Sequence, residues 1–175
     1  MHAATISVPS TVVTPRLPRR VPGYSTGQLS RCSGRRHAAC FSSASPAVRE
    51  ARAWVRHVTG LPTTEADLLE LLVAELTANA CTHSASGDEG GFLTLQVAFL
   101  GNSVIRIGVL DQGPRPGSRL CFPSVQVSEA DAEDGRGLAL VQGISRRFGV
   151  LGSIGEPLTV WAVVHRSDLR ATAAL

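Results

Sequence analysis

The feature that most constrains this chain is a change in hydrophobic period part-way along it. Apolar residues recur at helical spacing over residues 46–58, until Gly60 interrupts the pattern. A second apolar stripe at helical spacing consists of Leu69, Val73, Leu76 and Ala80. We expect Thr63 or Thr64 to cap this second helix and the helix to end near His83.

After residue 91 the pattern changes to that of β-strands. Residues 92–100 and 104–110 are apolar runs with several β-branched members. Only Gly101-Asn102-Ser103 separates the two runs. A short connection of turn-forming residues between two such runs indicates a β-hairpin.

A third helix and one more strand complete the pattern. The helix is predicted to begin at Gly137 and to place Val141, Ile144 and Phe148 on one face. Residues 158–164 then form a last strand-like run. A chain that interleaves amphipathic helices with strands in this way buries them against one another, so the sequence predicts a single α/β domain.

The positive charge of the chain is concentrated at its beginning. Among 175 residues there are 17 basic and 14 acidic ones, and residues 1–37 contain six arginines but no Asp or Glu. This segment has no helical or strand period, so we predict a disordered Arg/Pro/Ser-rich tail over 1–37, the folded domain over 38–166 and a short tail over 167–175. The domain itself is then slightly acidic.

Composition excludes several classes of site. Because the chain has no lysine, a Walker-type P-loop and a lysine-dependent kinase site are both excluded. The four cysteines are too widely spaced for a zinc site or a disulfide framework. No apolar run reaches the length of a membrane helix, so we expect a cytoplasmic protein with reduced thiols and no membrane contact.

The first candidate site is a row of polar residues on the second helix. Glu75, Asn79 and His83 are four residues apart, just over one helical turn, so they project as neighbours. An Asn carbonyl is a hard oxygen ligand suited to Mg²⁺ on nucleotide phosphates, and a nearby carboxylate can deprotonate a hydroxyl. Taken alone, the same spacing is more typical of a solvated helix face.

The second candidate site follows the strand over 104–110. Asp111 can accept a hydrogen bond from the exocyclic amine of adenine, and Gly113 leaves room for the base beside the backbone. Taken alone, an Asp at a strand end before Gly-Pro is also what a plain turn contains.

The third candidate site is the start of the third helix. Gly135, Arg136, Gly137 and Leu138 form a loop-to-helix junction, where free backbone N–H groups and the helix dipole attract phosphate. The segment over 112–134 precedes it and is long for a connection within a domain, which suggests a lid. A glycine-rich helix start without a ligand is the alternative.

The order of these motifs carries more information than any one of them. Glu-x-x-x-Asn on a helix, a strand followed by Asp-x-Gly, a lid-like segment and Gly-Arg-Gly-Leu-x-Leu-Val resemble the GHKL, or Bergerat-fold, ATPases. Within that superfamily the chain is similar to small actinobacterial ATP-binding regulators related to anti-sigma-factor serine/threonine kinases. The resemblance spans about Phe41 to Trp161. It implies a two-layer α/β sandwich of the histidine-kinase-like type with a mixed, mostly antiparallel sheet.

The resemblance also implies a role for each candidate residue. Glu75 would be the catalytic carboxylate, Asn79 the Mg²⁺ ligand and Asp111, with Gly113, the adenine contact of bound ATP. The residues that would surround the phosphates are Gly135, Arg136, Gly137 and Leu138. His83 either approaches the phosphates or ends its helix, where a cation suits the dipole.

Two functions of different classes follow. The first is a serine/threonine kinase that uses Mg-ATP to phosphorylate an anti-sigma-factor antagonist. The alternative is a non-catalytic, nucleotide-sensing module that sequesters a sigma factor or another regulator. It is favoured by Glu156-Pro157 after Gly155, where family members often carry a small, basic pair.

Other readings have less support. The catalytic half of a two-component histidine kinase is less favoured because no helical hairpin with a phosphoacceptor His precedes the domain. The arginine-rich tail lacks a groove-reading helix, so we expect no direct contact with nucleic acid. The resemblance also suggests a homodimer.

Overall fold

The computed structural model describes residues 35–42, 46–118 and 136–172. The strands are β1 (Arg36–Ser42), β2 (Phe92–Phe99), β3 (Val104–Leu110), β4 (Arg147–Leu151) and β5 (Thr159–His165). The helices are α1 (Ala47–Thr59), α2 (Thr63–His83), α3 (Arg136–Ile144) and α4 (Arg166–Thr172), with a short 3₁₀ helix η2 (Ala85–Gly87).

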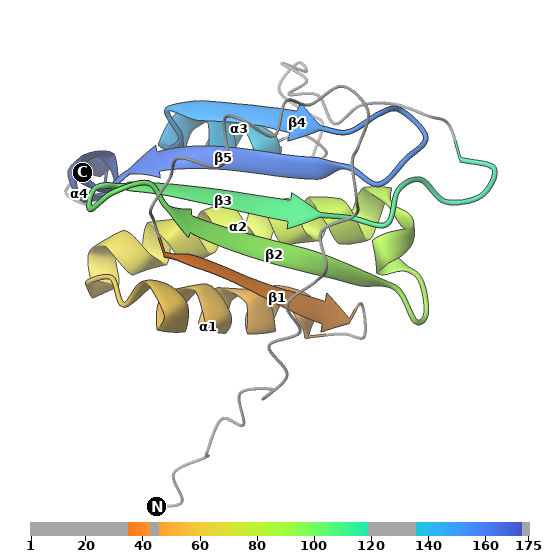
Figure 1. The fold of residues 1–175 in the computed structure, drawn as a ribbon, viewed down its shortest axis with the longest axis horizontal. Coiled ribbons are helices and arrows are strands. Elements are labelled where there is room, and N and C mark those ends of the chain that lie inside the picture. Colours follow the sequence, from red (N-terminus) through yellow and green to blue (C-terminus); the bar gives the residue numbers. More distant parts are fainter. Residues whose placement is uncertain (1–34, 43–45, 119–135, 173–175) are drawn as a thin grey trace, which may run out of the picture.

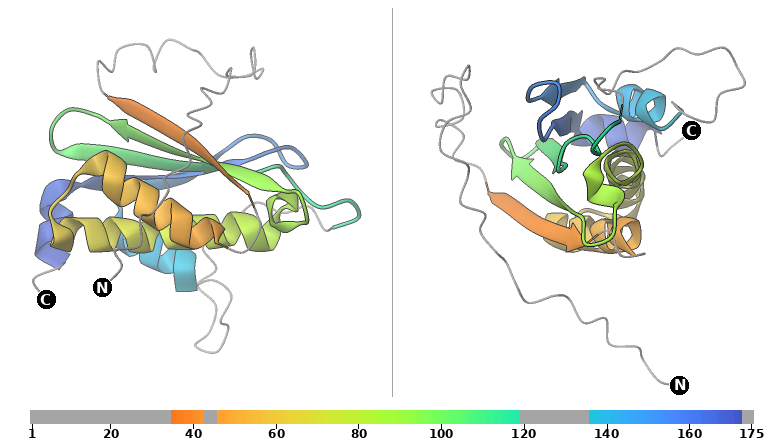
Figure 2. Two further views of the ribbon diagram at one scale, coloured as in Figure 1. Left: turned by 90° about the horizontal axis from the view of Figure 1, so that it is seen from below. Right: turned by 90° about the vertical axis from the view of Figure 1, so that its right-hand side faces the viewer.

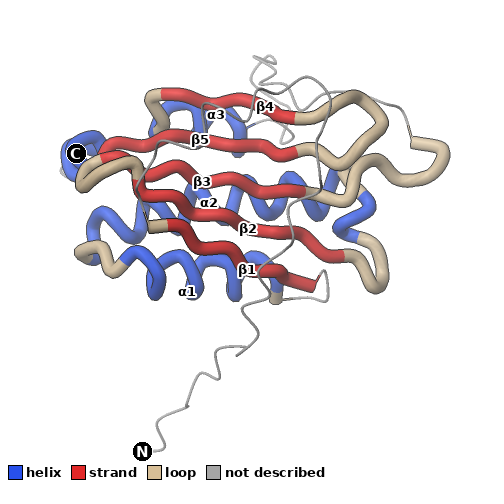
Figure 3. The backbone as a smooth tube through the Cα atoms, in the orientation of Figure 1, coloured by secondary structure: helices blue, strands red, loops and turns tan. Residues whose placement is uncertain are grey.

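The five strands form one sheet in the order β1-β2-β3-β5-β4 (Figures 1 and 3). Each neighbouring pair within it is antiparallel. The predicted hairpin of β2 and β3 is confirmed, with Leu95 opposite Val109. The last predicted strand, β5, lies between β3 and β4 and so joins the hairpin to the rest of the sheet.

The helices cover one face of the sheet, which makes the domain a two-layer α/β sandwich as predicted (Figure 2). The core lies between the layers. Its largest fully buried side chains include Leu69, Leu72 and Leu76 of α2, Leu93 and Leu95 of β2, and Ile105 and Ile107 of β3. Alternate strand residues point to the same face, so each of these strands contributes every second residue to the core.

Helix α2 lies at the centre of the helix layer. It contacts α1, α3 and α4 as well as the sheet, so buried residues occur on most of its circumference. Two of these buried residues, Glu65 and Glu70, are acidic. A buried carboxylate requires a charged or hydrogen-bonding partner, and both of them have arginine partners.

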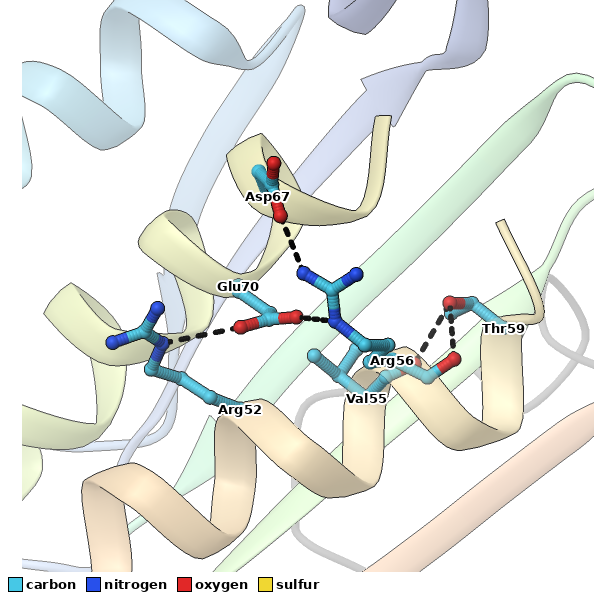
Figure 4. Close-up of polar contacts among 6 residues, drawn as sticks. All are labelled: Arg52, Val55, Arg56, Thr59, Asp67 and Glu70. Atoms are coloured by element: carbon cyan, nitrogen blue, oxygen red, sulfur yellow. Dashed lines mark hydrogen bonds and ion pairs between the residues drawn. The ribbon is translucent and has the colours of Figure 1, made fainter. Parts of the chain in front are cut away.

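Glu70 joins α2 to α1. Its carboxylate accepts from Arg52 Nε at 3.3 Å and from Arg56 Nε, and Arg56 also pairs with Asp67 (Figure 4). Both arginines are largely solvated, so these pairs orient the two helices and add little stability of their own.

Glu65 joins α2 to α4. Arg166 Nε donates to its Oε2 at 2.6 Å, and Arg170 Nε donates to its Oε1 at 2.8 Å. Leu169 of α4 is fully buried in the core. The prediction of a tail over 167–175 is therefore wrong for residues up to Thr172, because a buried leucine and two ion pairs dock them as a helix.

Three element boundaries differ from the prediction. Strand β1 begins at Arg36, two residues before the predicted domain start, because it gains a ladder of hydrogen bonds with β2. Thr63 is the first residue of α2, and Pro62 rather than a threonine precedes the helix. Phe148 lies in β4 opposite Ala162 of β5, not on the third helix, which ends at Ile144.

Within the three described ranges, no helix is both long enough and apolar enough to cross a membrane. Cys40 and Cys81, the cysteines of these ranges, are both free thiols.

Candidate functional site

Three loops meet at one end of the sheet. They are the segment after β3, the end of α2 with η2, and the loop between β4 and β5 (Figure 1). The main chain joins them directly: Ala85 N–H donates to Gly113 O at 2.8 Å, and Asp111 N–H donates to Leu158 O at 2.9 Å. Because these hydrogen bonds link all three loops, Asp111 and Gly113 have fixed positions.

Asp111, the predicted adenine contact, is almost fully buried at the end of β3. Its Oδ1 accepts two backbone hydrogen bonds, from Gly113 N–H at 2.7 Å and from Leu158 N–H at 2.9 Å. Within the described part of the chain, no donor reaches Oδ2. One carboxylate oxygen therefore holds the loops, and the other is left to accept from a ligand such as the amine of adenine.

Gly113 has a backbone conformation that favours glycine, with φ of +83°. It is also tightly packed, since a Cβ at this position would lie 3.0 Å from Glu156 C and from Pro157 N. The predicted spacer thus supports the β4–β5 loop directly beside the Asp111 carboxylate. A larger residue would displace that loop.

Two polar side chains that the sequence analysis did not single out support this segment. Ser86 Oγ accepts from Gln112 N–H at 2.9 Å, and Gln112 Oε1 accepts from Phe92 N–H at 2.7 Å. Ser86 is itself fully buried. These bonds fix Gln112, the residue between Asp111 and Gly113, to both η2 and the start of β2.

Arg115 is a further residue that the sequence analysis missed. Its guanidinium donates to three oxygens: Thr82 O at 2.7 Å, Cys81 O at 3.0 Å and Asp88 Oδ1 at 2.7 Å. The two carbonyls belong to the last turn of α2, where backbone acceptors lack helical partners. Arg115 therefore caps α2 and fastens the segment after Gly113 to it.

Glu75, Asn79 and His83 lie on successive turns of α2, as predicted. The side chains of Glu75 and Asn79 are half-buried, whereas His83 is exposed at the last residue of the helix. Within the described residues, none of the three has a hydrogen bond to another side chain. Glu75 and Asn79 are thus free to bind a ligand, and His83 is in the place where a cation complements the helix dipole.

Gly137 brings the first and third candidate sites together. Helix α3 packs against α2, and a Cβ built on Gly137 would clash with Glu75 Oε2 and lie 3.2 Å from its Cδ. The Glu75 carboxylate therefore lies against the first turn of α3, which is the predicted phosphate-binding junction. With a larger residue at 137, the carboxylate would have to move from this position.

Part of the third candidate site cannot be placed in the same way. Gly135 and most of the predicted lid, residues 119–134, lie outside the described residues. Arg136 and Leu138 belong to the first turn of α3, but the description does not extend to their side chains. Of the four predicted phosphate-binding residues, Gly137 is the one placed in full.

The oxygen-bearing side chains of α2 suit a Mg²⁺ ion that is bound to nucleotide phosphates. Among the described residues there is no group of three or more His, Cys, Asp or Glu side chains that could hold a metal by itself. Mg²⁺ in nucleotide sites takes one or two protein oxygens and completes its shell with phosphate oxygens and water. Asn79, one turn from Glu75, supplies such an oxygen.

Comparison with known families agrees with this arrangement. The model of the histidine kinase-like ATPase domain matches residues 39–160, which include the second half of β1, all of α1 and α2, and every described residue of the site. No curated protein matches the chain. Domains of this family bind ATP, generally with Mg²⁺. The chain thus belongs to the histidine kinase-like ATPase family.

Proposed function

We propose that this protein binds Mg-ATP and transfers its γ-phosphoryl group to a serine or threonine of a regulatory partner, an anti-sigma-factor antagonist. The observation that carries the proposal is the approach of Glu75 to Gly137. It puts a carboxylate with no protein partner among the described residues beside a helix N-terminus suited to phosphate.

The residues have separate roles in this proposal. Glu75 takes the proton from the attacking hydroxyl, and the backbone around Gly137 faces the phosphates. Asn79 would supply an oxygen to Mg²⁺, which neutralises charge on the phosphates when bound. Asp111 Oδ2 accepts from the adenine amine. Phosphoryl transfer depends mainly on positioning and charge, so one carboxylate suffices.

The choice of partner rests on the resemblance given by the motif order. This chain resembles regulators that phosphorylate an anti-sigma-factor antagonist. Such regulators capture or release a sigma factor according to the phosphorylation state of the antagonist. A homodimer is part of the same proposal.

A second candidate function is a nucleotide-sensing module that sequesters a regulator without phosphorylating it. Glu156 favours this candidate, because it is exposed in the β4–β5 loop that packs on Gly113. A negative charge at the rim of the site opposes the charge of a triphosphate.

Calorimetry of Mg-ATP binding to the full chain tests the shared part of both candidates. Asn79→Ala is expected to weaken Mg²⁺-dependent binding by about tenfold or more, which corresponds to ~1.4 kcal/mol. Asn102→Ala makes the same chemical change in the exposed turn between β2 and β3 and is expected to bind normally. Equal binding by both variants would remove Asn79 from the site.

Phosphotransfer separates the two candidates. With radiolabelled ATP and an anti-sigma-factor antagonist, the chain is expected to label the antagonist, and Glu75→Gln is expected to bind ATP but label at least about a hundredfold more slowly. ATP binding without label on any antagonist would favour the sequestering module.

A further inference from the structure

The candidate nucleotide site has two parts, which belong to different segments of the chain. Asp111 and Gly113 follow β3 and are assigned to adenine, whereas Glu75 and Asn79 lie on α2 and are assigned to the phosphates and Mg²⁺. A nucleotide that occupies the site must engage both parts at once. Its affinity therefore depends on how firmly the two parts are held relative to each other.

Hydrogen bonding at the end of α2 departs from the helical pattern. In a continued helix, Ala85 N–H would donate to Cys81 O. It donates instead to Gly113 O at 2.8 Å. The next N–H, that of Ser86, also turns away from the helix and donates to Ser84 Oγ at 3.0 Å. The carbonyls of the last turn are thus left without helical donors.

Arg115 replaces these donors with its guanidinium. Nη2 donates to Cys81 O at 3.0 Å, and Nη1 donates to Thr82 O at 2.7 Å. Nε donates to Asp88 Oδ1 at 2.7 Å. The end of α2 therefore loses a main-chain donor to the adenine segment and receives two side-chain donors from the same segment in return.

This link is rigid and spans a short length of chain. A guanidinium is planar and presents its donors in a fixed fork, so three bonds from one group fix its orientation. The same carbonyl is closely packed, since a Cβ built on Gly87 would clash with Cys81 O and lie 3.0 Å from Arg115 Nη2. Cys81 lies just beyond Asn79 on α2. Arg115 lies just beyond Gly113, so the link joins the two parts of the site.

We propose that Arg115 is a positioning residue of the nucleotide site, which holds Asn79 on α2 at the distance from Asp111 that Mg-ATP requires. The inference rests on the proposed function for the roles of Asn79 and Asp111. Each nitrogen of the Arg115 guanidinium donates to a protein oxygen, which favours action through the carbonyls of Cys81 and Thr82 over contact with phosphate. A ligand that engages both parts should then depend on Arg115, whereas a ligand of the adenine part alone should not.

Binding of two ligands to the full chain, measured by calorimetry, tests this. Mg-ATP engages both parts of the site, and adenosine engages the adenine part. Arg115→Gln is expected to weaken Mg-ATP binding by at least about tenfold and adenosine binding by less than about threefold. Arg115→Lys keeps the charge but lacks the planar fork, so its Mg-ATP affinity is expected to lie between those of the wild type and Arg115→Gln.

Arg146→Gln is the matched control. Arg146 Nε donates to Asp168 Oδ2 at 2.6 Å, so the variant also removes an arginine–aspartate pair. This pair joins the end of α3 to α4, at the opposite end of the sheet from the site loops (Figure 1). Arg146→Gln is expected to bind both ligands as the wild type does.

A double-mutant cycle separates positioning from a general loss of structure. If Arg115 acts by placing Asn79, Arg115→Gln should weaken Mg-ATP binding by less than about twofold when Asn79 is already alanine. A general loss of structure would add its full effect to that of Asn79→Ala. Should Arg115→Gln not fold in a urea titration, Arg115→Lys takes its place in the cycle.

Three results would overturn the inference while leaving the nucleotide site in place. They are wild-type affinity of Arg115→Gln for Mg-ATP, equal weakening of Mg-ATP and adenosine binding, and additive effects in the cycle. An unmutated chain that does not bind Mg-ATP would overturn the proposed function, and this inference with it.

Discussion

The carboxylate of Asp111 joins the end of β3 to the start of β5, because its Oδ1 accepts the N–H of Leu158 at 2.9 Å. The two residues are 47 positions apart in the sequence. The same oxygen accepts from Gly113, whereas no described donor reaches Oδ2. One oxygen of this side chain therefore has a structural role, and the other is the one to which we assign the proposed contact with adenine.

Substitutions of Asp111 are expected to separate these roles. Asp111→Asn keeps one oxygen that can accept both backbone N–H groups, so its free energy of unfolding should fall by less than about 1 kcal/mol. Its amide nitrogen cannot accept from adenine, and ATP affinity should drop at least about tenfold. Asp111→Ala should lose ATP affinity too, and its free energy of unfolding should fall by about 1–3 kcal/mol. Urea unfolding and calorimetry measure the two effects. Wild-type ATP affinity in Asp111→Asn would show that the adenine contact lies elsewhere.

Two glycines of α3 provide a second test. In Gly137→Ala the new methyl group meets the Glu75 carboxylate, so we expect Glu75 to move and ATP affinity or phosphotransfer to decrease by at least about tenfold. Gly143→Ala is the control, because nothing lies within 4 Å of its Cβ position and alanine favours a helix by roughly 0.5–1 kcal/mol. If both variants bind and react like the wild type, the contact between Gly137 and Glu75 has no functional role.

A third test separates backbone strain from packing in the adenine segment. Gly113 and Gly117 both have positive φ, +83° and +78°, but only Gly113 has main-chain atoms where a Cβ would be placed. Gly117→Ala should cost about 1 kcal/mol of stability from strain and leave ATP binding unchanged. Gly113→Ala should cost about 2 kcal/mol or more and weaken ATP binding, because Glu156 and Pro157 must move. Thermal unfolding and calorimetry compare the two, and equal behaviour would contradict the assigned role of Gly113.

The fourth prediction concerns pH. Hydrogen bonds from Arg166, and then from Arg170, hold the pKa of Glu65 below its ordinary value of 4.5, and Glu65 is only 1% exposed. A lowered folded-state pKa stabilises the fold above the unfolded-state value, and that stability is lost as the pH falls through the folded-state value.

Glu65→Gln should therefore reduce the free energy of unfolding by about 2 kcal/mol near neutral pH, with a difference from wild type that shrinks below the ordinary pKa. Urea unfolding from about pH 7 to about pH 3 measures this. Glu50→Gln, on the exposed face of α1, serves as the control and should show no such trend. A constant difference at all pH values would mean that the Glu65 charge does not hold α4.

The sequence predicted the elements whose own pattern is strong and missed those that depend on distant partners. Helix α2 and the hairpin of β2 and β3 have clear periods, and both are confirmed. Strand β1 is rich in small residues, so its pairing with β2 is what makes it a strand. Phe148 continues the helical period of Val141 and Ile144, yet pairing with β5 overrides it.

The same distinction applies to the site. Asp111, Gly113, Glu75 and Asn79 lie in short motifs and were predicted from them. Arg115 acts through hydrogen bonds to the carbonyls of Cys81 and Thr82, more than 30 residues earlier. Every residue has a main-chain carbonyl, so neither composition nor spacing could have identified these hydrogen bonds of Arg115.

The order of strands in the sheet has a consequence for how the protein folds. Three neighbouring pairs, β2 with β3, β4 with β5 and α1 with α2, are also close in sequence, and such local contacts cost little chain entropy. The pairing of β3 with β5 is non-local and joins the two hairpins. The hydrogen bond from Leu158 N–H to Asp111 Oδ1 lies at the end of this pairing. We expect the proposed adenine site to form only when β3 pairs with β5, so a partly folded chain with both hairpins in place would not yet bind nucleotide.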